Sequence, residues 1–374
     1  MTLDDARTAP ALPLTQHERL QREAATQPHL ISFAGGLPDA RLFPRKQFAA
    51  AFVEAMKGDE ALQYGWPEGS TGLRDQIARE LCSRGAKVIP EHVLITSGAQ
   101  QALAIAMAAL ARTDLAIGFD AETYPGALDA ARARNARIVG LEEKANAYYV
   151  MPAIRNPWGK RMSTSDCARV LAAANQHDAC IIEDDAYAET TFSTAPPPPL
   201  LATAPERVFH VGTFSKTLCP GLRIGWLVAP ERFQRVALEA KQTRDLQSSG
   251  LGQAVLETYL RGEHYCALKQ RLRKRYARRA RLMARAIRAH LPDFRFEAPE
   301  GGFSIWLESD LRVSDERLLE LAVEEGVSFD PGSAFRREPA PRLALRLSYS
   351  LVDDESIVPG LVALARAVRR ARAE

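Results

Sequence analysis

The sequence is poor in the residues that build metal centres and disulfide frameworks. It has five cysteines and seven histidines among 374 residues, and both types are scattered along the chain. No two cysteines form a C-x-x-C pair, and an odd number of isolated cysteines is atypical of a disulfide framework. We therefore expect no metal site and a reducing, cytoplasmic location. The cysteines are Cys82, Cys167, Cys180, Cys219 and Cys266.

The chain also lacks long apolar runs and a strong charge of either sign. No apolar segment approaches the roughly 20 residues of a membrane span. The first ten residues, MTLDDARTAP, carry two acids and lack the basic and then apolar layout of a signal peptide. A net charge of +3 is too small to indicate nucleic-acid or membrane partners. We expect neither kind of partner.

What the sequence does contain is an alternation of short apolar strands and helical segments. This alternation predicts an α/β fold with a mostly parallel sheet between helices. From Gly252 a long helical region runs to about His290, and an α+β pattern follows it, which predicts a second, smaller domain. The expected division is an N-terminal arm (1–30), a large domain (45–255), and a small α+β domain (31–44 with 256–374).

One stretch, Val211–Trp226, places a lysine in a tight turn between two apolar strands. In VGTFSKTLCPGLRIGW, Lys216 follows Thr213 and Ser215 and precedes Arg223. A desolvated lysine amine can form a Schiff base with an aldehyde. Ser, Thr and Arg donate the hydrogen bonds that a phosphate requires. An aldehyde and a phosphate on one cofactor indicate pyridoxal 5'-phosphate (PLP). Taken alone, Lys216 fits a surface lysine in a Ser/Gly-rich turn equally well.

A second feature is a helix that begins directly after an expected strand at 93–95. Ser97 and Gly98 stand at its start, where unpaired N–H groups and the helix dipole attract an anion. The same residues also suit an ordinary helix cap, so both interpretations stay open at this point.

Further polar residues follow or interrupt strands. Asp184 ends a strand in IIEDDAYAE, three residues before Tyr187. Such an acid can hydrogen-bond a pyridine nitrogen, and the tyrosine can donate to the ring's phenolic oxygen. Asn156 lies in RNPWG, and Arg346 interrupts the apolar LRLSYS, where a buried arginine requires an anion such as a carboxylate. The alternative for the acid is a helix cap or a surface position.

Together and in this order, the segments resemble the class I/II aminotransferases of PLP fold type I. The resemblance is greatest to the branch that contains aminoadipate, kynurenine and aromatic aminotransferases. It runs from about Ile31 to the C-terminus, and TFSKTLCPGLRIGW is its most specific segment. It implies transfer of an amino group between an L-amino acid and a 2-oxo acid by a ping-pong mechanism, with PLP as the cofactor.

The resemblance also implies a role for each matching residue around the cofactor ring. Lys216 would bind the aldehyde and later move the proton, which makes it catalytic together with Asp184 and Tyr187. Asp184 would pair with the pyridine nitrogen, while Tyr187 and Asn156 would hold the ring oxygen. Tyr124, in AETYPGAL, would stack on the ring.

For the substrate and the phosphate, the resemblance implies a second set. Arg346 would bind the substrate carboxylate with the help of Asn156, and Gly35 and Gly36 would pass close to it. Tyr64, in LQYGWPEG, would reach the phosphate in the neighbouring subunit, which implies a homodimer with shared active sites. The other residues expected at the phosphate are Gly98, Ala99, Gln100, Thr213, Ser215 and Arg223.

The sequence departs from the family pattern in three places. Trp158 stands where the usual N-P-T-G motif has a threonine, and Ala99 stands where many relatives carry a hydroxyl. The segment 138–149 is shorter than in the family. These departures leave every expected catalytic group in place and affect the packing around the cofactor.

Two other functions are compatible with part of this pattern. A PLP-dependent lyase, decarboxylase or cyclase differs in which substrate bond stands perpendicular to the ring, which no motif reports. The presence of Arg346 with Asp184, Tyr187 and Asn156 favours transamination. The second is a transcription regulator that carries this domain behind a DNA-binding module. Only about 30 residues precede the core, so we expect no such module.

Overall fold

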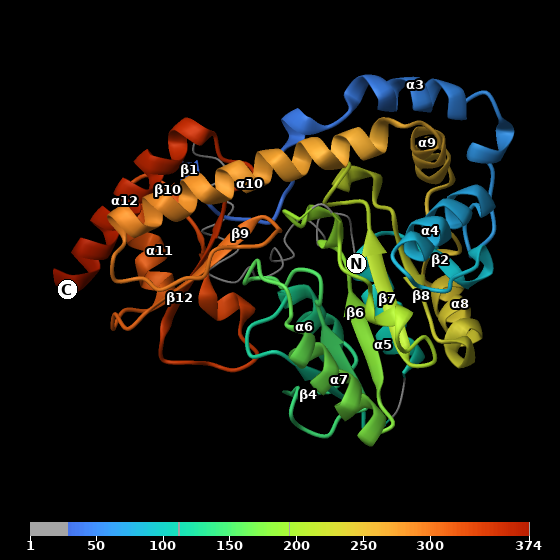
Figure 1. The fold of residues 1–374 in the computed structure, drawn as a ribbon, viewed down its shortest axis with the longest axis horizontal. Helices are drawn as coiled ribbons and strands as arrows, with labels where there is room; N and C mark the ends of the chain where they lie inside the picture. Colours follow the sequence, from blue (N-terminus) through green and yellow to red (C-terminus); the bar gives the residue numbers. More distant parts are fainter. Residues whose placement is uncertain (1–28, 111–112, 194, 374) are drawn as a thin grey trace, which may run out of the picture.

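The structure, a computed structural model, describes residues 29–110, 113–193 and 195–373, and a seven-stranded sheet forms its centre (Figure 1). The strands follow the order β2-β8-β7-β6-β5-β3-β4. Neighbours are parallel except that β8 is antiparallel to β2 and to β7. The predicted α/β fold with a mostly parallel sheet is confirmed. The bounds are β2 Val93–Thr96, β3 Ala116–Phe119, β4 Arg137–Gly140, β5 Ala147–Val150, β6 Cys180–Asp184, β7 Val208–Thr213 and β8 Gly225–Val228.

Helices cover this sheet because its central strands are buried on both faces. Every residue of β6 and β7 is buried, as expected for parallel strands packed on both faces. Helix α5 contacts β7 and β8, and α7 contacts β5. The start of α7 is fixed by a capping box between Ser163 and Asp166. The helices are α3 Arg45–Ala55, α4 Thr71–Ser83, α5 Ala99–Ala109, α6 Pro125–Arg132, α7 Thr164–Gln176, α8 Glu231–Asp245 and α9 Gly250–Arg261.

The C-terminal part of the chain builds a second, antiparallel sheet of order β11-β12-β9. Helix α12 packs on α10 and α11 beside it, and α10 runs from this sheet towards α3 and α9 (Figure 1). The short strand β1 pairs in parallel with β10, so the segment after residue 30 joins the C-terminal part. The bounds are β1 Ile31–Ser32, α10 His264–His290, β9 Ser304–Ser309, α11 Asp315–Glu324, β10 Val327–Ser328, β11 Asp330–Pro331, β12 Leu343–Ser348 and α12 Asp354–Ala373.

Several local expectations need correction. The single helical region expected from Gly252 to His290 is two helices, α9 and α10, separated at Gly262–Glu263. Helix α8 was not predicted. Arg279 of α10 is fully buried, although the helix is rich in arginine. Its Nη2 lies 2.9 Å from Asp39 Oδ2 and its Nε lies 3.1 Å from Asp354 Oδ1.

Two further points bear on the expectations for the chain ends and the membrane. Most of the expected N-terminal arm, 1–28, lies outside the described residues. Within the described ranges, no helix has both the length and the apolar character that a membrane crossing requires.

Substitution of Gly225, at the start of β8, should destabilise the fold. A Cβ there would lie 2.7 Å from the carbonyl oxygen of Gly212 and 2.9 Å from the backbone nitrogen of Ala99. Backbone atoms must then shift, so Gly225→Ala should lower the free energy of unfolding by about 1–3 kcal/mol in urea titrations. Gly221→Ala is the control, because its Cβ would meet only Cys219 Sγ at 3.7 Å. Equal unfolding midpoints for the two variants would contradict this reading.

Candidate active site

The carboxyl ends of β2, β5, β6 and β7 meet at one edge of the central sheet. These four strands run in the same direction. Asp184 ends β6 and Thr213 ends β7, while Gly98 follows β2 and Asn156 follows β5. In α/β sheets this edge is where ligands bind.

Lys216 lies in the turn after β7 and is half-buried. Its Nζ donates a hydrogen bond to the carbonyl oxygen of Gly36 at 2.8 Å, and it lies 5.1 Å from the centre of the Tyr187 ring. Gly36 belongs to the loop after β1, so this bond joins the central sheet to the part of the chain that pairs with the C-terminal half. Lys216 is therefore not the surface lysine of the alternative interpretation.

Asp184 is buried at the end of β6. The hydroxyl of Tyr149, on the neighbouring strand β5, donates to its Oδ2 at 2.7 Å, and the backbone N–H of Ala186 donates to Oδ1 at 3.0 Å. Burial raises the pKa of the Asp184 carboxyl, although both hydrogen bonds oppose that rise. Burial also raises the pKa of Tyr149 well above its ordinary value, so this hydroxyl acts as a donor. The sequence did not identify Tyr149, because its contact with Asp184 depends on which residues of β5 and β6 lie side by side.

The start of α5 and the turn around Arg223 lie against each other. No side chain caps α5, and Gly98 precedes it with φ of 92°. Arg223 has φ of 53°, and its Nη2 donates to the carbonyl oxygen of Ser97 at 3.1 Å. A Cβ on Gly98 would lie 2.8 Å from that same Nη2, so glycine lets the guanidinium approach the helix start. Thr213 and Ser215 lie on the adjoining turn, where their hydroxyls are hydrogen-bonded to each other.

Tyr124 and Gln100 are brought together near this helix start. The Tyr124 hydroxyl donates to Gln100 Oε1 at 3.1 Å, and Gln100 Nε2 donates to the carbonyl oxygen of Gly126 at 2.6 Å. The Gln100 side chain is thus committed to these neighbours, so only its backbone N–H suits the phosphate role. Burial raises the pKa of Tyr124 to about 12, which keeps its hydroxyl protonated at neutral pH.

Arg346, on β12, is paired with a carboxylate of the protein itself, Asp330. Its Nε and Nη2 both donate to Asp330 Oδ2, at 3.0 and 2.6 Å, and its Nη1 donates to Asn156 Oδ1 at 2.9 Å. The guanidinium also lies over the Phe335 ring, 4.4 Å from its centre. The sequence predicted that Arg346 binds the carboxylate of the substrate. It did not identify Asp330 as a partner of Arg346.

Trp158 has a packing role that explains its departure from the family pattern. Its ring lies 6.0 Å from that of Trp306, and the two belong to one apolar cluster with Phe335. Trp158 therefore packs against the cluster that contains the ring beneath Arg346.

Tyr64 is the predicted site residue that this chain does not bring to the others. Its side chain is 80% exposed in the segment before α4, next to an equally exposed Trp66. A role at the phosphate therefore requires a second chain.

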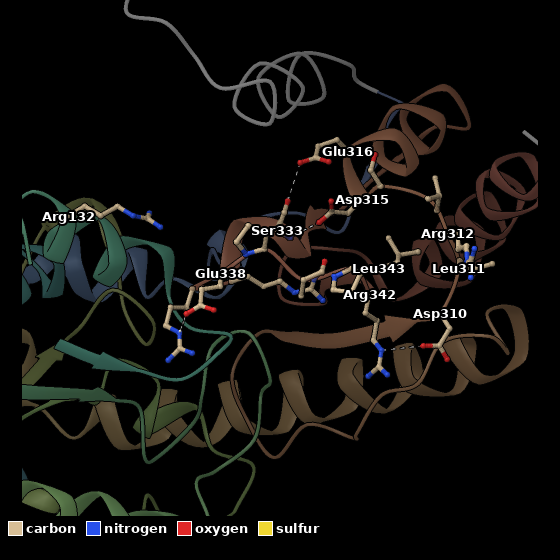
Figure 2. Close-up of a pocket in the computed structure, with 17 residues that line it drawn as sticks. Arg132, Asp310, Leu311, Arg312, Asp315, Glu316, Ser333, Glu338, Arg342 and Leu343 are labelled. Atoms are coloured by element: carbon tan, nitrogen blue, oxygen red, sulfur yellow. Dashed lines mark hydrogen bonds and ion pairs between the residues drawn. The ribbon is translucent and has the colours of Figure 1, made fainter. Parts of the chain in front are cut away.

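The donor set fits PLP. It offers an amine for the aldehyde, a buried carboxylate for the pyridine nitrogen, and a helix start with an arginine for the phosphate. Among the described residues, no cluster of His, Cys, Asp or Glu side chains is suited to bind a metal ion. A groove of about 1000 Å³ between residues 310–316 and 333–343 is lined by apolar and charged side chains, including Asp315 and Arg342, and contains none of these groups (Figure 2).

Comparison with known proteins agrees with this donor set. The family model for aminotransferase class I and II matches residues 30–364. A 2-aminoadipate transaminase of Thermus thermophilus is 33% identical over 92% of this chain and 91% of its own length. HTH-type transcriptional regulators are also among the relatives.

Two solved structures are similar over nearly the whole chain. The α-aminoadipate aminotransferase LysN of Thermus thermophilus, complexed with N-(5'-phosphopyridoxyl)-L-leucine, is 30% identical with a TM-score of 0.87 and covers 100% of both chains. The kynurenine aminotransferase of Pyrococcus horikoshii is 29% identical with a TM-score of 0.90 and covers 98% of both.

The raised pKa of Asp184 predicts how the stability of the cofactor-free protein depends on pH. The folded state holds the proton of Asp184 to higher pH than the unfolded state, so stability is lost as pH rises through the folded pKa. Asp184→Asn should therefore be more stable than the wild type at pH 8. The difference should shrink as the pH falls towards the ordinary pKa of 3.8 and vanish well below it, where Asp184 is protonated in both states.

Thermal unfolding of the two proteins between pH 4.5 and 8 measures this difference. Tyr149→Phe is the matched variant, because loss of its hydrogen bond raises the pKa of Asp184 further and should lower stability at pH 8. A lower Tm for Asp184→Asn than for the wild type at pH 8 would contradict the prediction.

Proposed function

This chain belongs to the class I and II aminotransferases and is a PLP-dependent transaminase, and from that premise we propose which of its residues carry the reaction. The observation that carries the assignment is the Lys216 amine at the strand edge that also holds the buried Asp184. The substrates are an amino acid and a 2-oxo acid. We propose that they use one site in turn, in a ping-pong sequence.

Lys216 and Asp184 form the centre of the proposal. When bound, PLP supplies an aldehyde that takes up an amine and a ring that withdraws electrons from the adjoining carbon. Lys216 would bind the aldehyde at rest and move the α-proton as general base and acid during turnover. Asp184 would hold the pyridine nitrogen in its protonated form, because a buried carboxylate gains most from an opposite charge.

The remaining ring contacts are assigned to residues at the same edge. Tyr187 and Asn156 would hold the ring oxygen, and Tyr124 would stack on the ring. The protonated hydroxyl of Tyr124 and the short distance from Lys216 to the Tyr187 ring support these roles. The phosphate would take N–H groups and side chains from Gly98, Ala99, Gln100, Thr213, Ser215 and Arg223.

The α-carboxylate of the substrate is assigned to Arg346, with Asn156 and Gly36 beside it. Nη1 of Arg346 donates to Asn156. A Cβ on Gly36 would lie 3.8 and 3.9 Å from its two terminal nitrogens. A planar guanidinium suits a carboxylate bidentately, which supports this assignment.

We also propose a homodimer, a cytoplasmic location and the division into domains expected from the sequence. The segment from α3 to α4 exposes an apolar surface, with Tyr64 and Trp66 both 80% exposed, which a second copy would cover. Free cysteines at all five positions are compatible with a reducing compartment. The other exposed members of this surface are Phe52, Val53, Met56 and Leu62.

Removal of the Lys216 amine should abolish amino transfer. The purified protein, loaded with PLP, is mixed with each amino acid in turn, and conversion to the pyridoxamine form is followed by absorbance. We expect Lys216→Ala to slow this conversion by on the order of 10⁴-fold or more. Lys57→Ala, an exposed lysine paired with Glu54, is the control and should convert normally. Conversion by Lys216→Ala at the wild-type rate would overturn the assignment.

The shared-site dimer has a separate test. Tyr64→Ala should bind PLP about 10 to 100-fold more weakly, because it lacks one hydrogen bond to a charged group. When Tyr64→Ala and Lys216→Ala are refolded together at limiting PLP, mixed dimers contain one intact site. Activity should then return to about a quarter of the wild-type value. Light scattering that reports a monomer, or no recovery in the mixture, would contradict the proposal.

A further inference from the structure

Asp330 and Arg346 form a buried ion pair across two strands. The two residues lie directly opposite each other in the β11–β12 register, and their side chains are only 7% and 8% exposed. One oxygen, Oδ2, accepts from both Nε and Nη2 of the arginine. The pair therefore holds the guanidinium by the side that carries Nε and Nη2.

The remaining contacts of Arg346 define which edge is left. An arginine carries five N–H groups in a fixed fork. Asp330 takes the one on Nε and one on Nη2, and Asn156 takes one on Nη1. One N–H on each terminal nitrogen is left over. Gly36 lies about equally far from both of these nitrogens, so the leftover edge borders the loop that also accepts the Lys216 hydrogen bond.

The same Asp330 oxygen also holds that loop. The backbone N–H of Gly35 donates to Oδ2 at 2.9 Å. One carboxylate oxygen thus ties the guanidinium to the segment that lies against the Lys216 amine. If this oxygen moved, Arg346 would shift relative to the Gly36 carbonyl oxygen that accepts the Lys216 hydrogen bond.

We propose that Asp330 is a positioning residue that sets the orientation of the substrate. It directs the terminal edge of Arg346 towards Gly36 and neutralises the charge of the arginine, so that a carboxylate binds in one orientation at moderate strength. This inference rests on the proposed role of Arg346 in binding the substrate carboxylate.

The experiment measures turnover and carboxylate binding separately in the PLP-loaded protein. Turnover uses the amino acid that converts fastest in the half-reaction screen. Binding uses calorimetry with 3-phenylpropionate, a carboxylate without an amino group. Asp330→Ala should bind 3-phenylpropionate as tightly as the wild type or more tightly, since an unpaired arginine attracts any carboxylate. Its kcat/KM should fall by on the order of 100-fold, since a misdirected substrate reacts slowly.

Equal or tighter binding of 3-phenylpropionate together with a lower kcat/KM indicates a positioning role. If both become weaker, Asp330 only supports the fold. If both improve, Asp330 competes with the substrate for Arg346. Either result overturns the proposal. Asp330→Asn, which keeps one acceptor oxygen, should show an intermediate loss of turnover.

Two controls separate this inference from the proposed function. Asp315→Asn removes another buried carboxylate from the same part of the chain, one that accepts from the backbone N–H of Ser333 (Figure 2). It should leave turnover and binding unchanged, and a loss like that of Asp330→Ala would overturn the proposal. Arg346→Ala should lose 3-phenylpropionate binding. If it keeps that binding, the carboxylate assignment fails, whatever Asp330→Ala shows.

Discussion

A buried carboxylate at the end of a parallel strand is the constraint on which the rest of this site depends. Asp184 has no exposure that would let water solvate its charge, and its two internal donors only partly compensate. Such a group is costly in an empty protein and is stabilised by a cationic partner. Asp184 lies where the carboxyl ends of β5, β6 and β7 meet, and the Lys216 amine lies at the same end of the sheet. In the proposed function, the protonated ring nitrogen of the cofactor offsets this cost.

The site is also a junction between two parts of the chain that are far apart in sequence. The pairing of β1 with β10 carries the loop after residue 30 from the C-terminal part to the central sheet. There, Gly36 accepts the hydrogen bond of Lys216, and Gly35 donates to Asp330. In the proposed function, Arg346 and Gly36 at the substrate carboxylate come from this second part, and Lys216 and Asp184 at the cofactor come from the central sheet.

The sequence was sufficient wherever the chemistry is local. The turn that holds Lys216, the strand that ends at Asp184 and the helix start after β2 each combine a recognisable apolar run with polar residues at fixed spacing. Tyr149, Asp330 and Arg279 escaped notice because their roles arise from pairing between distant segments, and a single sequence does not report strand register. Asp330 stands in a two-residue strand that periodicity cannot resolve. Tyr64 could be placed only by resemblance, since its proposed partner is another chain.

The buried Arg279 has a consequence for how the molecule can flex. A single guanidinium on α10 joins Asp39, just beyond the Gly35–Gly36 loop, to Asp354, the first residue of α12. Separating α10 from either element would remove a carboxylate partner of the buried Arg279, which is costly. The long helix α10, the segment around Asp39 and the start of α12 are consequently held together through one buried side chain.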